Sequence, residues 1–402
     1  MNISQRKFPA YGGMRSGNRY RYRWVTRLRR VGIVASFLAI LISVNLLISV
    51  KGDAYVIAPS STTSNISPRG KSKTGSSSVS SAKAAAVNQP IPAADATAET
   101  AILPANPIPV IARPAWLDLP LYVEPGNTAS AYANANPSAA NVNLIARMGQ
   151  QPVAHWFGDW DSNVTASVSS VVSAANNAGA VPVLVFYNIP DRDCGGYSAN
   201  GALTSSDYLK WVTQAAAGIA NRNAVVILEP DGLPDEDCLS SSGQQDRYQA
   251  ISQAVTIIKA QANAYVYIDA GNPTWQSVGT MASRLKTANI AGADGFSLNV
   301  ANFSPTSLNI GYAEQISNLV GGKHYVIDTS RNGGNMSVSG PLYNPPGASL
   351  GPIPTTHTST ARNDAQLWIK IPWESDAPVN GGPQAGDPFW SYAIQLAQNV
   401  GW

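Results

Sequence analysis

The run Val181-Pro-Val-Leu-Val-Phe186 leads directly into Tyr187-Asn-Ile-Pro-Asp-Arg-Asp-Cys-Gly-Gly-Tyr-Ser-Ala-Asn-Gly201. Its first part is apolar throughout, which is typical of a strand that is buried on both faces of a parallel sheet. The proline and glycines of the second part supply all that a turn requires. The two carboxylates, arginine, cysteine and two tyrosines exceed that requirement, so the stretch predicts a buried strand that ends at a functional site.

Five further apolar runs have the same character and are predicted to be strands. Together with residues 181–187, the predicted strands are residues 224–228, 264–268, 295–300, 324–327 and 367–371. Amphipathic stretches between them are predicted to be helices, at residues 207–220, 244–262 and 274–288. This alternation indicates βα units and therefore a parallel sheet.

Polar side chains follow nearly every predicted strand. They are Tyr187 and Asn188, Glu229 and Asp231, Asp269, Asn299, Asp328, and then Glu374 and Asp376 shortly after Lys370. In a barrel of parallel strands these ends meet on one face, where the active site is built. The pattern favours a parallel β/α barrel of the TIM type, although an open doubly wound sheet would also gather some strand ends.

Four carboxylates near these ends are candidates for catalysis, namely Asp193, Asp231, Asp269 and Asp376. Cleavage of a glycosidic bond requires a proton for the departing oxygen and help for the nucleophile, usually from two carboxyl groups. A single Asp is more often a helix cap or a turn residue. Four of them at strand ends favour an active site, in which crowding raises the pKa of a carboxyl group that acts as general acid.

Aromatic residues are frequent near the predicted loops and strand ends. They are Trp156, Trp160, Trp275, Trp373, Trp390, Tyr187 and Tyr197. Aromatic rings stack on the apolar C–H faces of sugars, but each of these side chains could equally belong to the core. Trp275, which comes six residues after Asp269, is the best candidate for a sugar-binding platform.

Composition and charge exclude several classes of function. Charged residues make up 13% of the 402 residues, and nine of the 27 bases precede residue 31. The remainder carries 18 bases against 24 acids, which argues against nucleic-acid binding. The chain has no nucleotide fingerprint, Walker loop, His-Glu-x-x-His pair or Gly-x-Ser-x-Gly elbow, so no cofactor is predicted. Two Cys and three scattered His argue against zinc.

The N-terminal quarter of the chain is predicted to lie outside the catalytic domain. Residues 1–30 form a basic arm, residues 31–50 lack any charge and can cross a membrane, and residues 51–101 form a Ser/Ala/Pro-rich linker. The arginines would keep the arm in the cytoplasm, so the domain at residues 102–402 would be exported. Alternatively, Arg29-Arg30 begins a cleaved signal, which would make the protein secreted.

The two cysteines, Cys194 and Cys238, both lie in the exported part. In an oxidising compartment they are predicted to form one disulfide, which would stabilise the fold by restricting the unfolded chain. Two buried free thiols are the alternative.

Eight distinct motifs follow one another over residues 104–402. They are Tyr122-Val-Glu-Pro125, His155-Trp-Phe-Gly-Asp-Trp160, Tyr187-Asn-Ile-Pro-Asp-Arg-Asp-Cys194, Val226-Ile-Leu-Glu-Pro-Asp231, Tyr267-Ile-Asp-Ala-Gly271, Asn299-Val-Ala-Asn302, Ile327-Asp-Thr-Ser-Arg-Asn332, and Lys370 with Glu374-Ser-Asp376. This set resembles the motifs of glycoside hydrolase family 6, the cellulases that include endoglucanases and cellobiohydrolases. The resemblance implies an incomplete parallel β/α barrel with about seven strands and inverting hydrolysis of β-1,4-glucan.

The resemblance also implies roles for individual residues. Asp231 matches the general acid, Asp193 the residue that keeps this acid protonated, and Asp376 the candidate base. The substrate-binding residues implied or proposed are Tyr187, Asp269, Trp275, Lys370, Glu374, Trp156 and Asn299, and Cys194 and Cys238 match the family's first disulfide. The expected partner is β-glucan, bound by a monomeric domain without metal or cofactor.

The loop after the last motif bears on the mode of attack. About fourteen residues separate Asp376 from Trp390, which is short for a loop that roofs a cleft. An open cleft favours internal cutting, so an endoglucanase is predicted, with a cellobiohydrolase as the alternative. A surface glucan-binding protein that has lost activity is the alternative from a different class.

Overall fold

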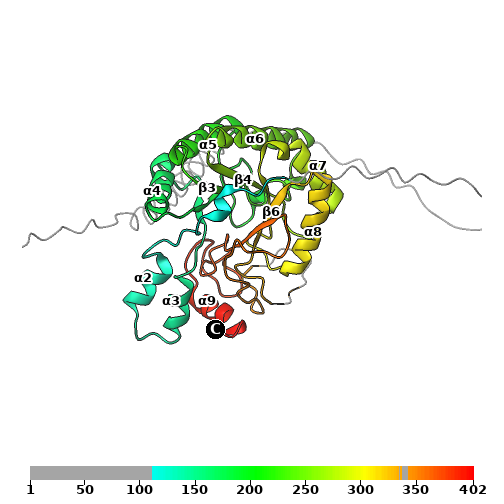
Figure 1. The fold of residues 1–402 in the computed structure, drawn as a ribbon. Coiled ribbons are helices and arrows are strands. Elements are labelled where there is room, and N and C mark those ends of the chain that lie inside the picture. The colour runs from blue at the N-terminus through cyan, green and yellow to red at the C-terminus, as the bar shows by residue number, and fades with distance from the viewer. Residues whose placement is uncertain (1–110, 335, 337–342) are drawn as a thin grey trace, which may run out of the picture. The chain divides into compact units, whose positions relative to one another are not determined.

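The computed structural model describes residues 111–334, 336 and 343–402. Its centre is a sheet of seven parallel strands in the order β1-β2-β3-β4-β5-β6-β7 (Figure 1). The strands are β1 (His155–Phe157), β2 (Val183–Phe186), β3 (Ala224–Leu228), β4 (Ala264–Asp269), β5 (Gly295–Leu298), β6 (His324–Asp328) and β7 (Asn363–Leu367). Each strand is paired with the one that follows it in the chain.

The sheet curls into an incomplete barrel, because β1 and β7 do not form a ladder with each other in the described part of the chain. Two hydrogen bonds cross the gap between them. The Ala154 amide donates to the Trp368 carbonyl at 3.0 Å, and the Trp156 indole donates to the Ile369 carbonyl at 2.8 Å. We call this pair of bonds the seam. The predicted incomplete barrel is confirmed, and the uninterrupted strand order excludes a doubly wound sheet.

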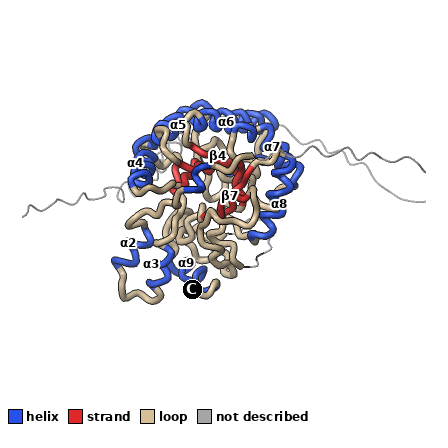
Figure 2. The backbone as a smooth tube through the Cα atoms, in the orientation of Figure 1, coloured by secondary structure: helices blue, strands red, loops and turns tan. Residues whose placement is uncertain are grey.

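Helices α4 to α8 cover the outside of the sheet as an arc, while α2, α3 and α9 lie together beside the barrel (Figure 2). The α-helices are α2 (Thr128–Ala135), α3 (Val142–Met148), α4 (Val164–Asn177), α5 (Ser205–Ile219), α6 (Ser241–Lys259), α7 (Val278–Thr287), α8 (Thr306–Leu319) and α9 (Trp390–Asn399). The 3-10 helices are η1 (Ala115–Asp118), η2 (Asp193–Gly195), η3 (Glu236–Cys238) and η4 (Ile290–Gly292).

Side-chain caps decide where the three predicted helices begin. The side chains of Thr204, Ser240 and Ser277 each accept a hydrogen bond from a backbone amide three residues later, at the starts of α5, α6 and α7. Such caps satisfy amides that have no partner within the helix. The predicted helices are confirmed, but α7 begins at Val278 rather than at residue 274 because Ser277 is its cap.

Two strand predictions need correction. Strand β1 was not predicted, since His155–Phe157 is too short to show a pattern. The predicted strand at residues 367–371 is wrong, because β7 is Asn363–Leu367 and contains buried polar residues. After β7 the Ile369 and Lys370 amides donate to the Asp328 carboxylate, at 3.3 and 2.9 Å, which takes the chain out of the sheet.

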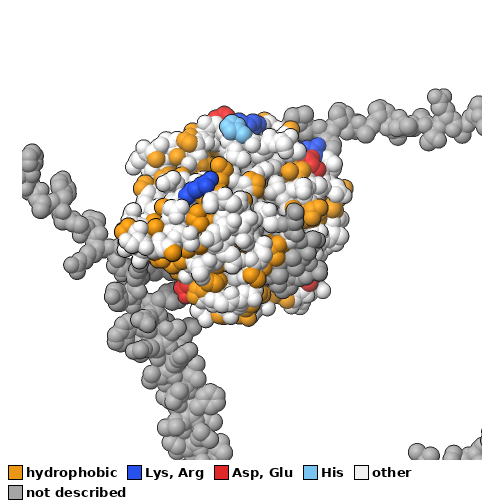
Figure 3. Space-filling model, turned by 90° about the horizontal axis from the view of Figure 1, so that it is seen from below, with side chains coloured by type: hydrophobic (Ala, Val, Ile, Leu, Met, Phe, Trp, Pro, Cys, Tyr) orange, Lys and Arg blue, Asp and Glu red, His pale blue; other side chains and the backbone are white. Residues whose placement is uncertain are grey.

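Strands β2 and β3 are apolar throughout because both of their faces are buried. Along β2, Leu184 and Phe186 pack in the layer between the sheet and its helices, whereas Val183 and Val185 pack inside the barrel. The same alternation holds in β3. The surface seen in Figure 3 carries few charged side chains, with hydrophobic ones scattered among neutral polar groups, as expected from a chain with 13% charged residues.

The predicted arm at residues 1–30, the apolar segment at 31–50 and the linker at 51–101 all lie outside the described residues. Within the part that is described, no helix combines the length and the apolar character that crossing a membrane requires.

Candidate active site

Asp231 lies in a tight turn that directly follows β3. The Gly232 amide donates to the Glu229 carbonyl at 2.9 Å and closes this turn. Glu229 and Asp231 both have a positive φ, of 50° and 67°, which costs free energy in residues other than glycine. The Asp231 amide donates to Asp269 Oδ2 at 3.0 Å, so the turn is held against the end of β4.

The surroundings of Asp231 favour its protonated form. Burial raises the pKa of Asp231 well above its usual value, and the nearby charges of Asp269 and Asp193 raise it further. Burial also raises the pKa of Asp269 to about 7, against the effect of the donors that hold its carboxylate, which include the Gly271 amide and the Ser297 hydroxyl. Asp231 is therefore suited to deliver a proton at neutral pH.

Asp193 lies in the loop after β2, beside Asp231. Its φ of 57° and that of Cys194, 44°, belong to a sharply folded loop. The Ser198 amide donates to Asp193 Oδ2 at 2.6 Å. A side chain at Gly196 would place its Cβ 2.6 Å from the same oxygen, so the carboxyl group of Asp193 would have to shift. Burial raises the pKa of Asp193, and its position raises the pKa of Asp231.

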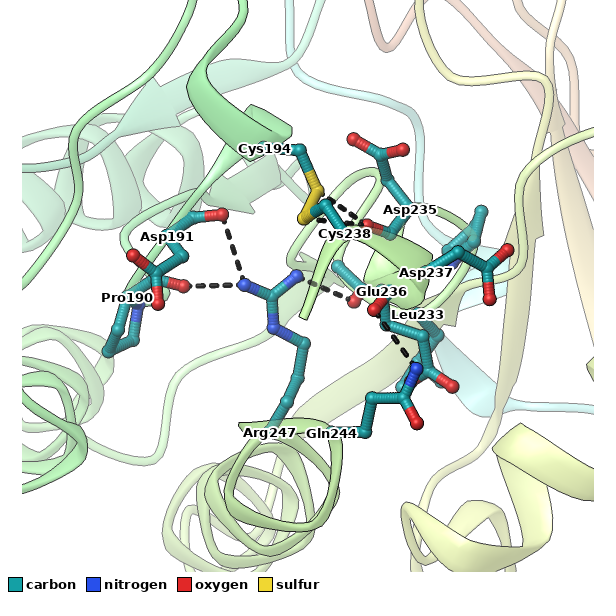
Figure 4. Close-up of a disulfide and its surroundings, with 12 residues drawn as sticks. Pro190, Asp191, Cys194, Leu233, Asp235, Glu236, Asp237, Cys238, Gln244 and Arg247 are labelled. Carbon is teal, nitrogen blue, oxygen red and sulfur yellow. Dashed lines mark hydrogen bonds between the residues drawn. A yellow bond between two sulfur atoms is a disulfide. The ribbon is translucent and has the colours of Figure 1, made fainter. Parts of the chain in front are cut away.

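The loops after β2 and β3 are joined by a disulfide between Cys194 and Cys238 (Figure 4), which confirms the prediction. Arg247 of α6 lies between the same loops. Its guanidinium donates to the Pro190 carbonyl at 2.6 Å and to the Gly232 carbonyl at 3.1 Å. The loops that carry Asp193 and Asp231 are thus tied together twice.

Asp376 lies in the loop after β7 and is surrounded by donors. Arg331 donates to its Oδ2 at 2.7 Å, and the Asn344 amide donates to the same oxygen at 3.1 Å. The Lys370 ammonium lies 3.9 Å from both the Asp376 and the Glu374 carboxylates. Burial lowers the pKa of Lys370 and raises that of Glu374 to about 7. Asp376, Lys370 and Glu374 therefore form one cluster with Arg331, which was not assigned a role from the sequence.

The segment Tyr343-Asn344 links the two acid groups. Burial raises the pKa of the Tyr343 hydroxyl, and the charges of Asp193 and Asp231 add to the effect. The ring of Tyr343 meets that of Tyr197 edge-on, with centroids 5.1 Å apart. Since the Asn344 amide donates to Asp376, acids from both halves of the barrel approach this segment.

The predicted aromatic residues divide between the site and the core. Tyr187 is buried beside the acids, and Trp156 packs edge-on against its ring at 5.4 Å. Trp275 and Trp160 are 36% and 44% exposed, as a binding platform requires, and Tyr197 is exposed too. Trp373 is 2% exposed and belongs to the core. Trp390 packs against that same cluster at the start of α9.

Asn299 does not present its side chain to the site. It is fully buried at the end of β5, and its amide group donates to the Asp328 carbonyl at 2.9 Å and accepts from the Ser304 amide at 3.1 Å. Both ends of this side chain are occupied by backbone, so we assign it to the loop structure rather than to substrate binding.

Three residues of the site had no role in the sequence-based prediction, namely Arg331, Tyr343 and Asn344. Arg331 occurs within a motif shortly after β6. An arginine close to a strand end could have been predicted to pair with one of the acids near the other strand ends. Tyr343 and Asn344 follow no strand directly, and nothing in their local sequence marks them. In the described ranges, no three His, Cys, Asp or Glu side chains are grouped to hold a metal ion.

A comparison with known families decides the assignment. Residues 117–400 match the model of Glycosyl hydrolases family 6. The chain belongs to this family. Family 6 membership agrees with the eight motifs and with the incomplete barrel, and thus confirms the resemblance inferred from the sequence.

Curated family 6 relatives are similar over most of the catalytic domain. Endoglucanase 1 of Streptomyces halstedii is 40% identical over 285 residues, which are 68% of this chain and 87% of the relative. Endoglucanase A of Thermobispora bispora is 42% identical over 65% of this chain, but the match spans 59% of the relative's own length.

Solved structures from family 6 share the fold. The endoglucanase Cel6 of Mycobacterium tuberculosis, in complex with methyl-cellobiosyl-4-deoxy-4-thio-β-D-cellobioside, is 43% identical with a TM-score of 0.68. It covers 71% of this chain, and 98% of that structure is matched. The cellobiohydrolase Cel6A from Chaetomium thermophilum, at 21% identity and a TM-score of 0.60, shows a shared fold alone.

Proposed function

We propose that this protein is an endoglucanase that hydrolyses internal β-1,4-glucosidic bonds of cellulose or a related β-glucan. The observation that carries the proposal is Asp231, whose pKa is raised by burial and by three neighbouring carboxylates in a chain that belongs to family 6. Relatives named endoglucanase, at 40–42% identity, support internal cutting. Those named cellobiohydrolase C are 24–25% identical.

In the proposed mechanism Asp231 donates its proton to the departing glycosidic oxygen. Asp193 keeps this proton in place through its charge. Asp376, held by Arg331 and Lys370, serves as the base that activates water, directly or through a second water. Inversion leaves room for water between acid and base, so we expect the carboxyl groups of Asp231 and Asp376 to be about 6.5 to 9.5 Å apart with substrate bound.

Substrate binding is proposed for the exposed and charged groups around these acids. Trp275 offers a platform, Lys370 and Glu374 offer partners for hydroxyl groups, and Tyr187 presses on the sugar at the point of cleavage. Trp156 supports Tyr187 from behind through its edge-on contact.

Replacing the acid tests the assignment. We expect Asp231→Ala to lower the rate on a soluble β-glucan by about 10²- to 10⁴-fold, because general acid catalysis contributes on that order. A cellobioside with a good leaving group should be affected less, since its departure needs little protonation. Asp246→Ala, an exposed residue of α6, is the control. Undiminished turnover by Asp231→Ala would remove the central assignment.

Two product measurements separate the alternatives. An endoglucanase lowers the viscosity of a glucan solution early, when few reducing ends have formed, whereas a cellobiohydrolase releases cellobiose with little loss of viscosity. Proton NMR of the first products shows the α-anomer if hydrolysis inverts. A protein that binds glucan and releases no reducing ends would support the inactive binding module instead.

We also propose that the domain is exported and anchored by residues 31–50. The support is twenty residues without a charge after a basic arm. Expression of the full chain should place activity outside the cell in the membrane fraction, and recovery of a shortened chain from the medium would show cleavage of a signal instead.

A further inference from the structure

Three buried carboxyl groups at the ends of the strands accept hydrogen bonds from neighbouring strands or from the segments that follow them. They are Glu229 after β3, Asp269 in β4 and Asp328 in β6, and none is more than 1% exposed. Together they connect every pair of adjacent strands from β2 to β7 at the edge where the candidate active site lies.

Glu229 connects the two segments that carry Tyr187 and Asp231. The Asn188 amide donates to both of its carboxylate oxygens, at 3.1 and 2.9 Å, and the Ile189 amide donates at 3.0 Å. Asn188 directly follows Tyr187, while Glu229 itself begins the turn that presents Asp231. One side chain therefore fixes the distance between these two parts of the site.

Asp328 fixes the backbone around the partners of Asp376. Four backbone amides donate to its carboxylate, two of them from Ala301 and Lys370 at 3.0 and 2.9 Å. The carbonyl of Ala301 in turn accepts from Arg331 at 2.6 Å. Asp328 therefore fixes the backbone of Lys370 and a second partner of Arg331, and these two cations flank Asp376.

We propose that Glu229 and Asp328 are positioning residues, with Glu229 placing the acid side of the cleft and Asp328 placing the cations of the base side. The inference rests on the proposed function. A carboxylate is needed because both of its oxygens accept hydrogen bonds, whereas an amide would turn an N–H₂ group toward the backbone N–H donors. Neither residue touches the reacting atoms.

The test compares Glu229→Gln and Asp328→Asn with a matched control. Asp294→Asn makes the same chemical change at the opposite end of the barrel, where Asp294 accepts from the Val266 amide at 2.7 Å and pairs with Lys259 at 2.9 Å. We expect kcat on a soluble β-glucan to fall at least tenfold in the two cleft variants at 25 °C, and the control to keep its kcat while its unfolding temperature drops.

The pH profile separates positioning from loss of stability. Asp328→Asn should lower kcat over the whole pH range, because the displaced Arg331 and Lys370 no longer hold the side chain of Asp376 in place. Glu229→Gln should move the alkaline limb to lower pH, because a looser turn exposes Asp231 to water. Folded cleft variants with the kcat and both limbs of the wild type would overturn the inference, as would equal changes in Asp294→Asn.

A measurement of substrate binding tests the inference independently of the proposed catalytic activity. Calorimetry with cellotetraose should show weaker binding to Asp328→Asn than to Asp294→Asn, because Lys370 is displaced. If the wild type binds cellotetraose but never cleaves β-glucan, the proposed function fails, and this comparison still decides the role of Asp328. If Asp328→Asn does not fold, Glu229→Gln decides through its kcat and alkaline limb, and a wild-type result would overturn the inference.

Discussion

The raised pKa of Asp231 has two causes, its burial and the charges of its neighbours. Burial raises the pKa of its carboxyl group, and the negative charges of Asp269, Asp193 and Asp235 raise it further. Each influence penalises the ionised form, so together they keep the acid protonated where a free Asp would have lost its proton.

Neutralising one neighbour should therefore shift the pH dependence. In Asp193→Asn the like charge next to Asp231 disappears, its charged form becomes less costly, and its pKa falls. We expect the alkaline limb of kcat/KM to move to lower pH. The same change at the exposed Asp207, in the first turn of α5, is the control. A limb that stays in place would show that Asp193 does not set this pKa.

Single residues were predictable where a motif placed a charged group at a strand end or in the loop that follows it. Asp193, Asp231 and Asp269 met this condition, and the structure brings them together. Arg331 was missed because its partner, Asp376, follows a different strand. Asn299 occupies a strand end too, but its neighbours in space are backbone groups, which no local pattern reveals.

At the scale of elements, the apolar runs predicted strands well where both faces are buried by hydrocarbon. The prediction failed at β7, since Asp364 is buried against the hydroxyl of Tyr267 and the ring of His324. Polar residues that satisfy each other inside a barrel look like a loop in the sequence. The later apolar residues of that region looked like a strand, although their amides turn to Asp328.

The loops after β2 and β3 allow a test at this scale. Replacing Cys194 and Cys238 together with Ser should lower the free energy of unfolding by about 3 to 4 kcal/mol in the chain-entropy model. Arg247 still joins the loops, so we expect kcat to stay within about threefold in the folded protein at 25 °C. Denaturant unfolding and an activity assay measure the two effects.

A variant of Arg247 tests the second connection between the same two loops. Arg247→Met keeps much of the side chain's bulk but removes its donors, and combined with the double Ser variant it should lower kcat well beyond either change alone. Additive effects on kcat would contradict the idea that the disulfide and Arg247 both hold the two loops in place.

For the whole molecule, buried carboxyl groups make stability depend on pH. Burial raises the pKa of Glu229, Asp269 and Glu374 to about 7. The folded state then holds protons that the unfolded chain releases, so this contribution is lost as pH rises through 7. His155 opposes the trend, because burial lowers its pKa to about 4 and its contribution is lost as pH falls from 6.5.

Three groups outweigh one, so we expect the free energy of unfolding to be greater at pH 5 than at pH 8. Denaturant unfolding at several pH values measures the slope. The variant His155→Gln should steepen it, since the opposing group is gone. Stability that increases from pH 5 to pH 8 would contradict this account.

The seam is the place where we expect the barrel to open locally. A ladder of backbone bonds opens cooperatively, whereas two isolated bonds at Ala154 and Trp156 can break without disturbing the strands beside them. Deuterium should therefore replace the Ala154 amide proton long before that of Val226 in the middle of β3. Such local opening would separate the edge of the sheet at β1 from the segment that follows β7, while the ladders from β1 to β7 stay intact.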